Sequence, residues 1–153
     1  MKFSFELLTA SNYGAAVDCI TETFVQGEPM LNALGVTRTE FRYFSELFIS
    51  KAVKEEMSFV VKQDRQVAAA VINEDLFGQP PEGLWMLSEK LGPVMDILEK
   101  LDNLYITEDM QKTGECFHIF MGGVFKKFEG KSIAANMVIK SQEIAKEKGF
   151  KHI

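Results

Sequence analysis

Residues 116–149 read CFHIFMGGVFKKFEGKSIAANMVIKSQEIAKEKG, and this stretch decides the fold that we expect. The run 116–124 is apolar apart from His118, which is typical of a strand covered on both faces in the middle of a sheet. A basic turn with Gly130 follows, and then an amphipathic helix that ends at Gly149. A strand that enters a helix through such a turn favours binding of a phosphorylated ligand at the helix N-terminus.

Length and composition indicate one globular domain. The chain has 153 residues, of which 46% are hydrophobic and 25% are charged. A net charge of -5 argues against general affinity for nucleic acid or for an anionic membrane surface, and no segment has the length and apolarity of a membrane span. Cys19 and Cys116 both lie in apolar patterns, so we expect two free thiols, a reducing compartment and a cytoplasmic protein.

The first half of the chain alternates strand and helix signals. We expect a strand over 2–8, a helix capped by Ser11 or Asn12 that ends at Gly27, a second helix opened by a capping box, and a hairpin. The capping box is 37–40, the second helix carries Phe41, Phe44, Phe48 and Ala52 on one side, and the hairpin joins 58–62 to 66–73 around 63–65.

The later segments are less regular. A helical pattern over 84–103 contains Gly92-Pro93, which predicts two helices separated at that point. Residues 102–115 are a polar connection, and Phe150–Ile153 resembles the beginning of another strand. The sequence has no metal-binding spacing and no serine-hydrolase motif, so we expect no metal site.

Three features allow two interpretations each. Pro29 forces Glu28 into an extended conformation on a loop, where it is either a solvated carboxylate or a functional one. The phenylalanines of the second helix are either core or the wall of a pocket. His118 is either a hydrogen-bonded core histidine or a base that faces a ligand.

The segment 124–138, VFKKFEGKSIAANMV, resembles the acetyl-CoA-binding motif of the Gcn5-related N-acetyltransferases (the GNAT superfamily). In that family a strand ending in Val is followed by Q/R-x-x-G-x-G/A at the start of a helix. The pattern falls on 129–134 here, with two departures, Glu129 in place of Gln or Arg and Ser132 in place of Gly. A carboxylate beside a pyrophosphate is repulsive unless it points to solvent.

The segment 24–30, FVQGEPM, followed by Leu34-Gly35, is similar to a loop of invertebrate arylalkylamine N-acetyltransferases whose Glu-Pro supplies the proposed general base. The resemblance implies an α/β (α+β) fold, with a mixed, mainly antiparallel sheet flanked by helices. It also implies that residues 1–153 are a single N-acetyltransferase-like domain, truncated after the helix that follows the fourth strand.

The implied activity is direct, acetyl-CoA-dependent N-acetylation of a small amine of the arylalkylamine or polyamine class, with Glu28 as general base. Amides near a bulge at Gly122-Gly123 would stabilise the oxyanion. The residues implied to bind acetyl-CoA are Gly122, Gly123, Val124, Glu129, Gly130, Lys131, Ser132, Ile133 and Ala134. The alternative is a truncated or degenerate domain that binds CoA or a protein partner without catalysis, and that dimerises through the unpaired edge of its fourth strand.

Overall fold

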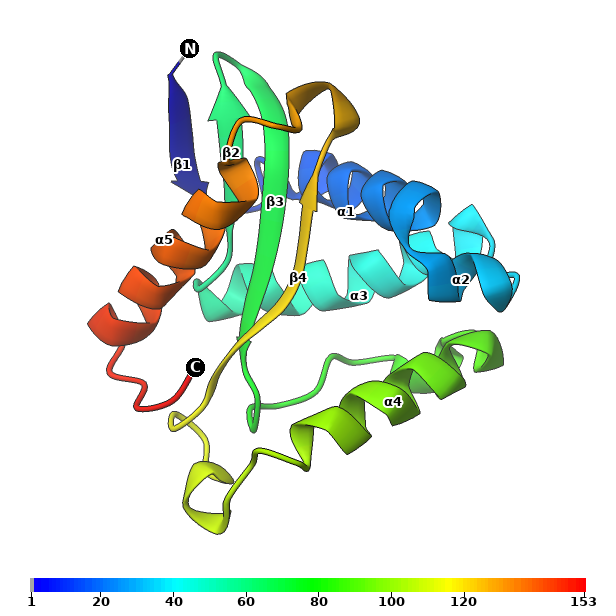
Figure 1. The fold of residues 1–153 in the computed structure, drawn as a ribbon, viewed down its shortest axis with the longest axis vertical. Helices are drawn as coiled ribbons and strands as arrows, with labels where there is room; N and C mark the ends of the chain where they lie inside the picture. Colours follow the sequence, from blue (N-terminus) through cyan, green and yellow to red (C-terminus); the bar gives the residue numbers. More distant parts are fainter. Residues whose placement is uncertain (1) are drawn as a thin grey trace.

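The computed structural model describes residues 2–153 as one sheet with helices on both faces (Figure 1). The four strands stand in the order β1-β2-β3-β4, and each neighbouring pair is antiparallel. The strands are β1 (Phe3–Leu7), β2 (Phe59–Gln63), β3 (Gln66–Asp75) and β4 (Phe117–Val124). The α-helices are α1 (Tyr13–Gly27), α2 (Pro29–Ala33), α3 (Arg38–Glu55), α4 (Gly92–Asp102) and α5 (Ile133–Glu147).

The helices form two layers, as Figure 1 shows. Helices α1 and α3 cover one face of the sheet, and α5 crosses the other. The α1/α3 side has the larger core, which includes Ile20, Ile49 and Val60, and the α5 side packs Met137 against Val61. The expectation that helices cover both faces of β4 is therefore confirmed.

The expectation that β4 lies in the middle of the sheet is wrong for the described residues, where β4 is an edge strand. Within residues 2–153, the outer side of β4 is paired at one end, where Cys116 forms an isolated parallel bridge with His152. There the Phe117 N–H donates a hydrogen bond to the His152 carbonyl at 2.9 Å. An apolar pattern in a strand indicates that both faces of the strand are covered by other parts of the protein. It carries no information about backbone pairing at the edge.

Several local predictions are confirmed. Thr37 and Glu40 form the reciprocal capping box of α3. The β2–β3 hairpin turns through Asp64, at a φ of 57°. Gly149 follows α5 with a φ of 82°, as a helix-ending glycine does. Cys19 and Cys116 are buried free thiols.

Three local predictions need correction. Asn12 precedes α1 but makes no capping bond, because its side chain closes the preceding turn by accepting from the Thr9 N–H and donating to the Leu7 carbonyl. Glu28 does not lie on a loop as expected, because Pro29 starts the short helix α2, for which its fixed φ suits the first turn. Instead of two α-helices over 84–103, two short 3-10 turns precede α4.

A buried polar cluster around Asn73 attaches α5 to the sheet. The Asn73 side chain donates to the Met57 carbonyl at 2.8 Å and accepts from the Ser141 hydroxyl at 3.1 Å. Its backbone N–H is bonded to Ser58 Oγ at 2.9 Å. Because Asn73, Ser58 and Ser141 are all fully buried, these bonds specify how α5 sits on the sheet.

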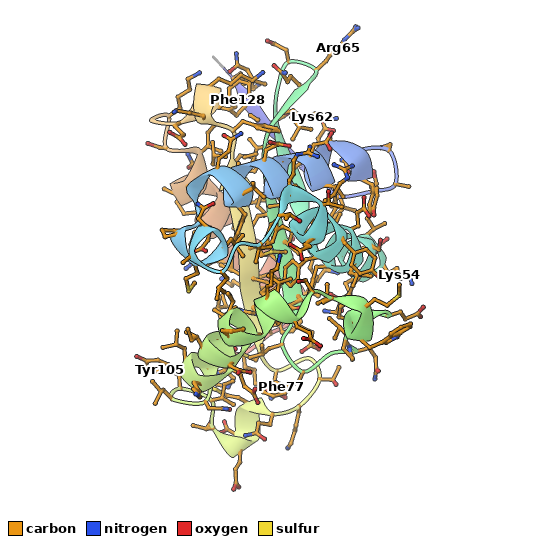
Figure 2. All side chains as sticks on the ribbon, turned by 90° about the vertical axis from the view of Figure 1, so that its right-hand side faces the viewer. Lys54, Lys62, Arg65, Phe77, Tyr105 and Phe128 are labelled. Carbon is orange, nitrogen blue, oxygen red and sulfur yellow. The ribbon has the colours of Figure 1, made fainter. Side chains whose placement is uncertain are left out.

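Helix α4 lies apart from the other two layers. Figure 2 looks at the molecule from the side of α1 and shows α4 below α1 and α3, with Phe77 beneath it and Tyr105 beyond its end. None of its residues is buried, although Met95 is partly buried and packs against the core of the α1/α3 side. Among residues 2–153, no helix combines the length and the apolarity that crossing a membrane requires.

Candidate active site

Glu28 is the N-cap of α2. Its backbone is extended, at φ -94° and ψ 110°, which confirms the effect expected of Pro29. Its side-chain Oε2 accepts a hydrogen bond from the Leu31 N–H at 2.9 Å. The carboxylate is therefore held by the first turn of α2 rather than fully solvated, and Oε1 is left as the oxygen that can interact with a ligand.

An apolar pocket of about 230 Å³ lies against Glu28. Phe41 and Phe44 of α3 form part of its wall, and Phe120 and Met121 of β4 form another part. The two interpretations of the α3 phenylalanines are thus both correct, because these rings are buried in the core and also face the pocket. We call this space the proximal pocket.

A bulge in β4 places Phe120 and Met121 on the same pocket. The register runs Ile72↔Met121 and then Asn73↔Ile119, so Phe120 has no partner of its own. The pairs Val71↔Gly122 and Ala70↔Gly123 are regular, so the bulge is not at Gly122-Gly123, where we expected it. An extra residue in one strand turns two consecutive side chains toward one face, and here that face carries α1 and α3.

The register also determines which backbone groups of β4 face its open edge. The Phe125 N–H donates to the Ala68 carbonyl at 3.0 Å, in line with the pair Ala70↔Gly123. Because hydrogen-bonded and non-bonded pairs alternate, Gly123 points toward β3, whereas Gly122 and Val124 present their N–H and C=O groups to the open side. These two residues are the ones placed to pair with an extended ligand.

Gly123 serves the site in another way. It lies so close to α1 that an added Cβ would be 2.2 Å from Thr23 Oγ1. This close approach brings the end of α1 beside the end of β4. A cavity of about 300 Å³ there is lined by Glu28 and by Gly122–Val124, and we call it the middle cavity.

A third space, the turn cavity, continues from the middle cavity past the end of β4. It has about 480 Å³ and shares Thr23, Gly27 and Val124 with the middle cavity. Its walls add Glu22 and Gln26 of α1 and Lys126, Lys127 and Glu129 of the turn. The proximal pocket and the middle cavity in turn share Glu28, so the three spaces follow one another from α4 to the turn.

The turn before α5 combines a 3-10 turn with two left-handed residues. Lys126–Phe128 form one 3-10 turn, and Gly130 and Ser132 have positive φ angles of 72° and 58°. The first backbone bond of α5 is donated by the Asn136 N–H to the Ser132 carbonyl at 3.1 Å. Like the first amides of any helix, those of residues 133–135 have no acceptor within α5, and they can bind an anion.

Ser132 occupies a left-handed position that an L-residue adopts at a cost. The family pattern has glycine at this position, which the positive φ explains. Glu129 is exposed and extended, and it lines the turn cavity together with two lysines. Of the two departures from the pattern, Glu129 therefore lies in the wall of the turn cavity, and Ser132 is the N-cap of α5.

His118 is hydrogen bonded, as in the first of its two interpretations, but its side chain is 28% exposed and does not belong to the core. Its Nδ1 lies 3.1 Å from Oε1 of Glu74, whose Oε2 accepts from Lys51 at 2.7 Å. Burial opposes ionisation of Glu74, but the bonds from His118 and Lys51 outweigh it and hold the pKa of this carboxyl below its usual value. Sequence reasoning did not identify Glu74, because no local pattern connects β3 with α3 and β4.

Neither a reactive thiol nor a metal centre accompanies these groups in the described part of the chain. Burial raises the pKa of the Cys19 thiol to about 12, although a backbone hydrogen bond at Ala70 lowers it, so this thiol is not a nucleophile at neutral pH. Among residues 2–153, no three His, Cys, Asp or Glu side chains are grouped to hold a metal ion.

Comparison with protein-family models gave no match, and neither did a search of curated proteins. Solved structures do match. The C-terminal condensation domain of Ebony, in complex with β-alanyl-dopamine, superposes with a TM-score of 0.82 at 22% identity, over 98% of this chain and 73% of that one.

Two acetyltransferase structures also match. Arylalkylamine N-acetyltransferase 2 from Aedes aegypti has a TM-score of 0.77 at 23% identity, over 98% of this chain and 73% of its own. A polyamine N-acetyltransferase from Drosophila melanogaster has a TM-score of 0.71 at 14% identity, over 97% and 73% respectively. At these identities the likeness concerns the fold, and this chain has the GNAT fold of the arylalkylamine and polyamine N-acetyltransferases.

Proposed function

We propose that this chain is an N-acetyltransferase domain that transfers the acetyl group of acetyl-CoA to a small primary amine of the arylalkylamine or polyamine class. The observation that carries the proposal is the position of Glu28. It lies where the proximal pocket, which fits the body of an amine, meets the middle cavity, which exposes the backbone of β4.

The residues present fit acetyl-CoA in three respects. Gly122 and Val124 offer unpaired backbone groups at the open edge of β4, to which an extended pantetheine can bind as a strand does. The amides that open α5 can hold the pyrophosphate. Lys126 and Lys127 line the turn cavity, where they can offset the charge of Glu129.

The catalytic role that we propose for Glu28 is general base. Bound acetyl-CoA supplies an activated thioester. Oε1 of Glu28 takes a proton from the bound ammonium, directly or through a water molecule, so that the nitrogen lone pair becomes available for attack. Backbone N–H groups on the open edge of β4 stabilise the negative charge that develops on the carbonyl oxygen. The C–S bond then breaks and CoA leaves as a thiolate, which takes up the second proton lost by the amine nitrogen, while the first passes from Glu28 to solvent.

The test uses two measurements on the full chain. Acetyl-CoA at a hundred times its Kd should stabilise the fold by about 2.7 kcal/mol, which a thermal unfolding scan detects. Release of CoA thiol should then depend on an added amine. Acetyl-CoA that neither raises the melting temperature nor yields thiol with any amine contradicts the proposal.

One observation favours a second candidate, a domain that binds CoA or a protein partner without catalysis. The backbone of β4 is open at its outer edge beside Gly122 and Val124 in the described chain, and such an edge pairs readily with another strand. Chromatography that shows a dimer, together with an unchanged melting temperature in acetyl-CoA, would support this candidate and not the first.

A further inference from the structure

A fourth space, of about 390 Å³, shares Phe120 with the proximal pocket and is not lined by Glu28. It is lined by residues at the ends of β3 and β4, by α3 and by α4. Figure 2 shows Phe77, one of its lining residues, beneath α4. The side chains that matter here are Phe48, Glu74, Glu99, Asp102, His118 and Phe120. We call this space the distal cavity.

The distal cavity continues the proximal pocket. Phe120, Met95 and Leu98 line both spaces. An aromatic wall also runs between them, because the ring centroids of Phe44 and Phe48 are 4.6 Å apart and those of Phe48 and Phe120 are 4.7 Å apart. The ring centroids of Phe120 and His118, the next pair along this wall, are 5.4 Å apart. A flexible ligand that enters at Glu28 therefore meets a continuous apolar surface that leads to His118.

The end of this path is polar and hydrogen bonded. Glu74 has a side chain that is 14% exposed, and both of its oxygens are engaged, one by His118 and the other by Lys51. An ionised carboxylate can only accept hydrogen bonds, so Nδ1 of His118 carries the proton. In the uncharged tautomer that this bond selects, Nε2 is the nitrogen that can accept a hydrogen bond, and Glu74 orients it.

The distal cavity also carries an excess of negative charge. Its lining residues include Glu74, Glu99 and Asp102 but no lysine or arginine. Lys51 offsets the charge of Glu74. Within residues 2–153, Glu99 and Asp102 take part in no salt bridge, so these two carboxylates of α4 remain available to a cation.

We propose that the distal cavity binds the far, protonated nitrogen of a linear diamine or polyamine whose other nitrogen lies at Glu28. Glu99 and Asp102 pair with the far ammonium, His118 Nε2 accepts one of its N–H bonds, and the faces of Phe48 and Phe120 flank the alkyl chain. This inference rests on the proposed acetyl transfer, and it selects the polyamine class over the arylalkylamine class.

The first experiment compares substrates on the full chain with acetyl-CoA. A series of α,ω-diamines, from 1,3-diaminopropane to 1,8-diaminooctane, is compared with n-alkylamines of the same lengths and with 2-phenylethylamine. At the best length, we expect kcat/KM for the diamine to exceed that of its matched monoamine by about tenfold. Equal values for all three kinds of amine, or a preference for 2-phenylethylamine, overturn the inference.

The second experiment removes the two free carboxylates. In Glu99→Gln/Asp102→Asn we expect KM for the best diamine to rise about tenfold, with kcat nearly unchanged, and KM for the matched monoamine to stay the same. Asp96→Asn is the control, because Asp96 is an exposed carboxylate on α4 that lines neither cavity. An unchanged diamine KM in the double variant, or an equal effect of Asp96→Asn, contradicts the assignment.

Calorimetry of diamine binding in the absence of acetyl-CoA separates the proposed acetyl transfer from the proposed distal site. If no amine is acetylated, the proposed function fails. The distal site is then still supported when the parent chain binds the diamine and Glu99→Gln/Asp102→Asn does not. If amines are acetylated but diamine binding is the same in both proteins, the proposed function stands and the distal site is wrong.

Discussion

Gly123 of β4 and Thr23 of α1 touch at a point where no side chain can be added, because a Cβ on Gly123 would lie 2.2 Å from Thr23 Oγ1. Thr23 Oγ1 is itself held by donating to the Cys19 carbonyl at 2.8 Å. This contact sets the distance between the end of α1, which leads directly into Glu28, and the strand that we propose to bind pantetheine. The geometry of the site thus depends on glycine at position 123, which has no side chain.

Gly123→Ala should force α1 away from β4. We expect a loss of about 1–3 kcal/mol in the free energy of unfolding, as for other overpacked cores, and weaker binding of acetyl-CoA. Urea denaturation and calorimetry measure the two effects. Gly122→Ala is the stability control, since its Cβ would meet the flexible end of the Met137 side chain at 3.3 Å. Thr23→Ala should recover part of the loss in a double-mutant cycle, and strict additivity would contradict the contact.

Glu28 has a structural role as well as the proposed catalytic one, and two substitutions separate them. In Glu28→Gln the amide side chain keeps an oxygen for the Leu31 N–H but cannot act as a base, so stability should change little while kcat falls about 10²- to 10⁴-fold. Glu28→Ala should lose about 1 kcal/mol of stability in addition, because the cap is removed. If Glu28→Gln retains the parent kcat, Glu28 is not the base.

Restoring the family pattern in the turn should strengthen cofactor binding. Ser132→Gly relieves the positive φ but increases the entropy of the unfolded chain, so we expect stability to change by less than about 1 kcal/mol. Glu129→Gln removes a negative charge from the turn cavity and should lower the Kd of acetyl-CoA a few-fold, less at high salt. Glu147→Gln, at the other end of α5, is the control, and an equal gain there would show a general charge effect instead.

The capping box of α3 should make the fold acid sensitive. Hydrogen bonds from the Thr37 backbone and side chain, and from Lys90 and Ser88, lower the pKa of Glu40 from 4.5 to about 2. A carboxyl whose pKa is depressed by folding stabilises the fold above its unfolded pKa. This contribution should be lost as the pH falls from 4.5 toward 2.

Urea midpoints measured across that pH range provide the check on Glu40. The parent chain should lose more stability on acidification than Glu40→Gln, which has no charge to lose. Parallel curves for the two proteins would show that the ionisation of Glu40 is not coupled to folding.

The local features of this chain could be predicted because each depends on residues close together in the sequence. Pro29 restricts Glu28 directly, and Thr37 and Glu40 are three residues apart in one helical turn. The prediction that placed the bulge at Gly122-Gly123 was wrong, because a bulge does not depend on neighbouring residues alone. It is defined by the pairing of β4 with β3, and no dipeptide in β4 reveals it.

The sequence by itself determined the strand–turn–helix unit of 116–149, the extended backbone at Glu28 and the resemblance that implies acetyl-CoA, because backbone preferences and motifs are properties of neighbouring residues. Tertiary structure alone decided that β4 lies at the edge of the described sheet, that Thr23 meets Gly123, and that Glu74 orients His118. These relationships join residues from different elements. They arise from sheet register and helix packing, which the whole chain settles together.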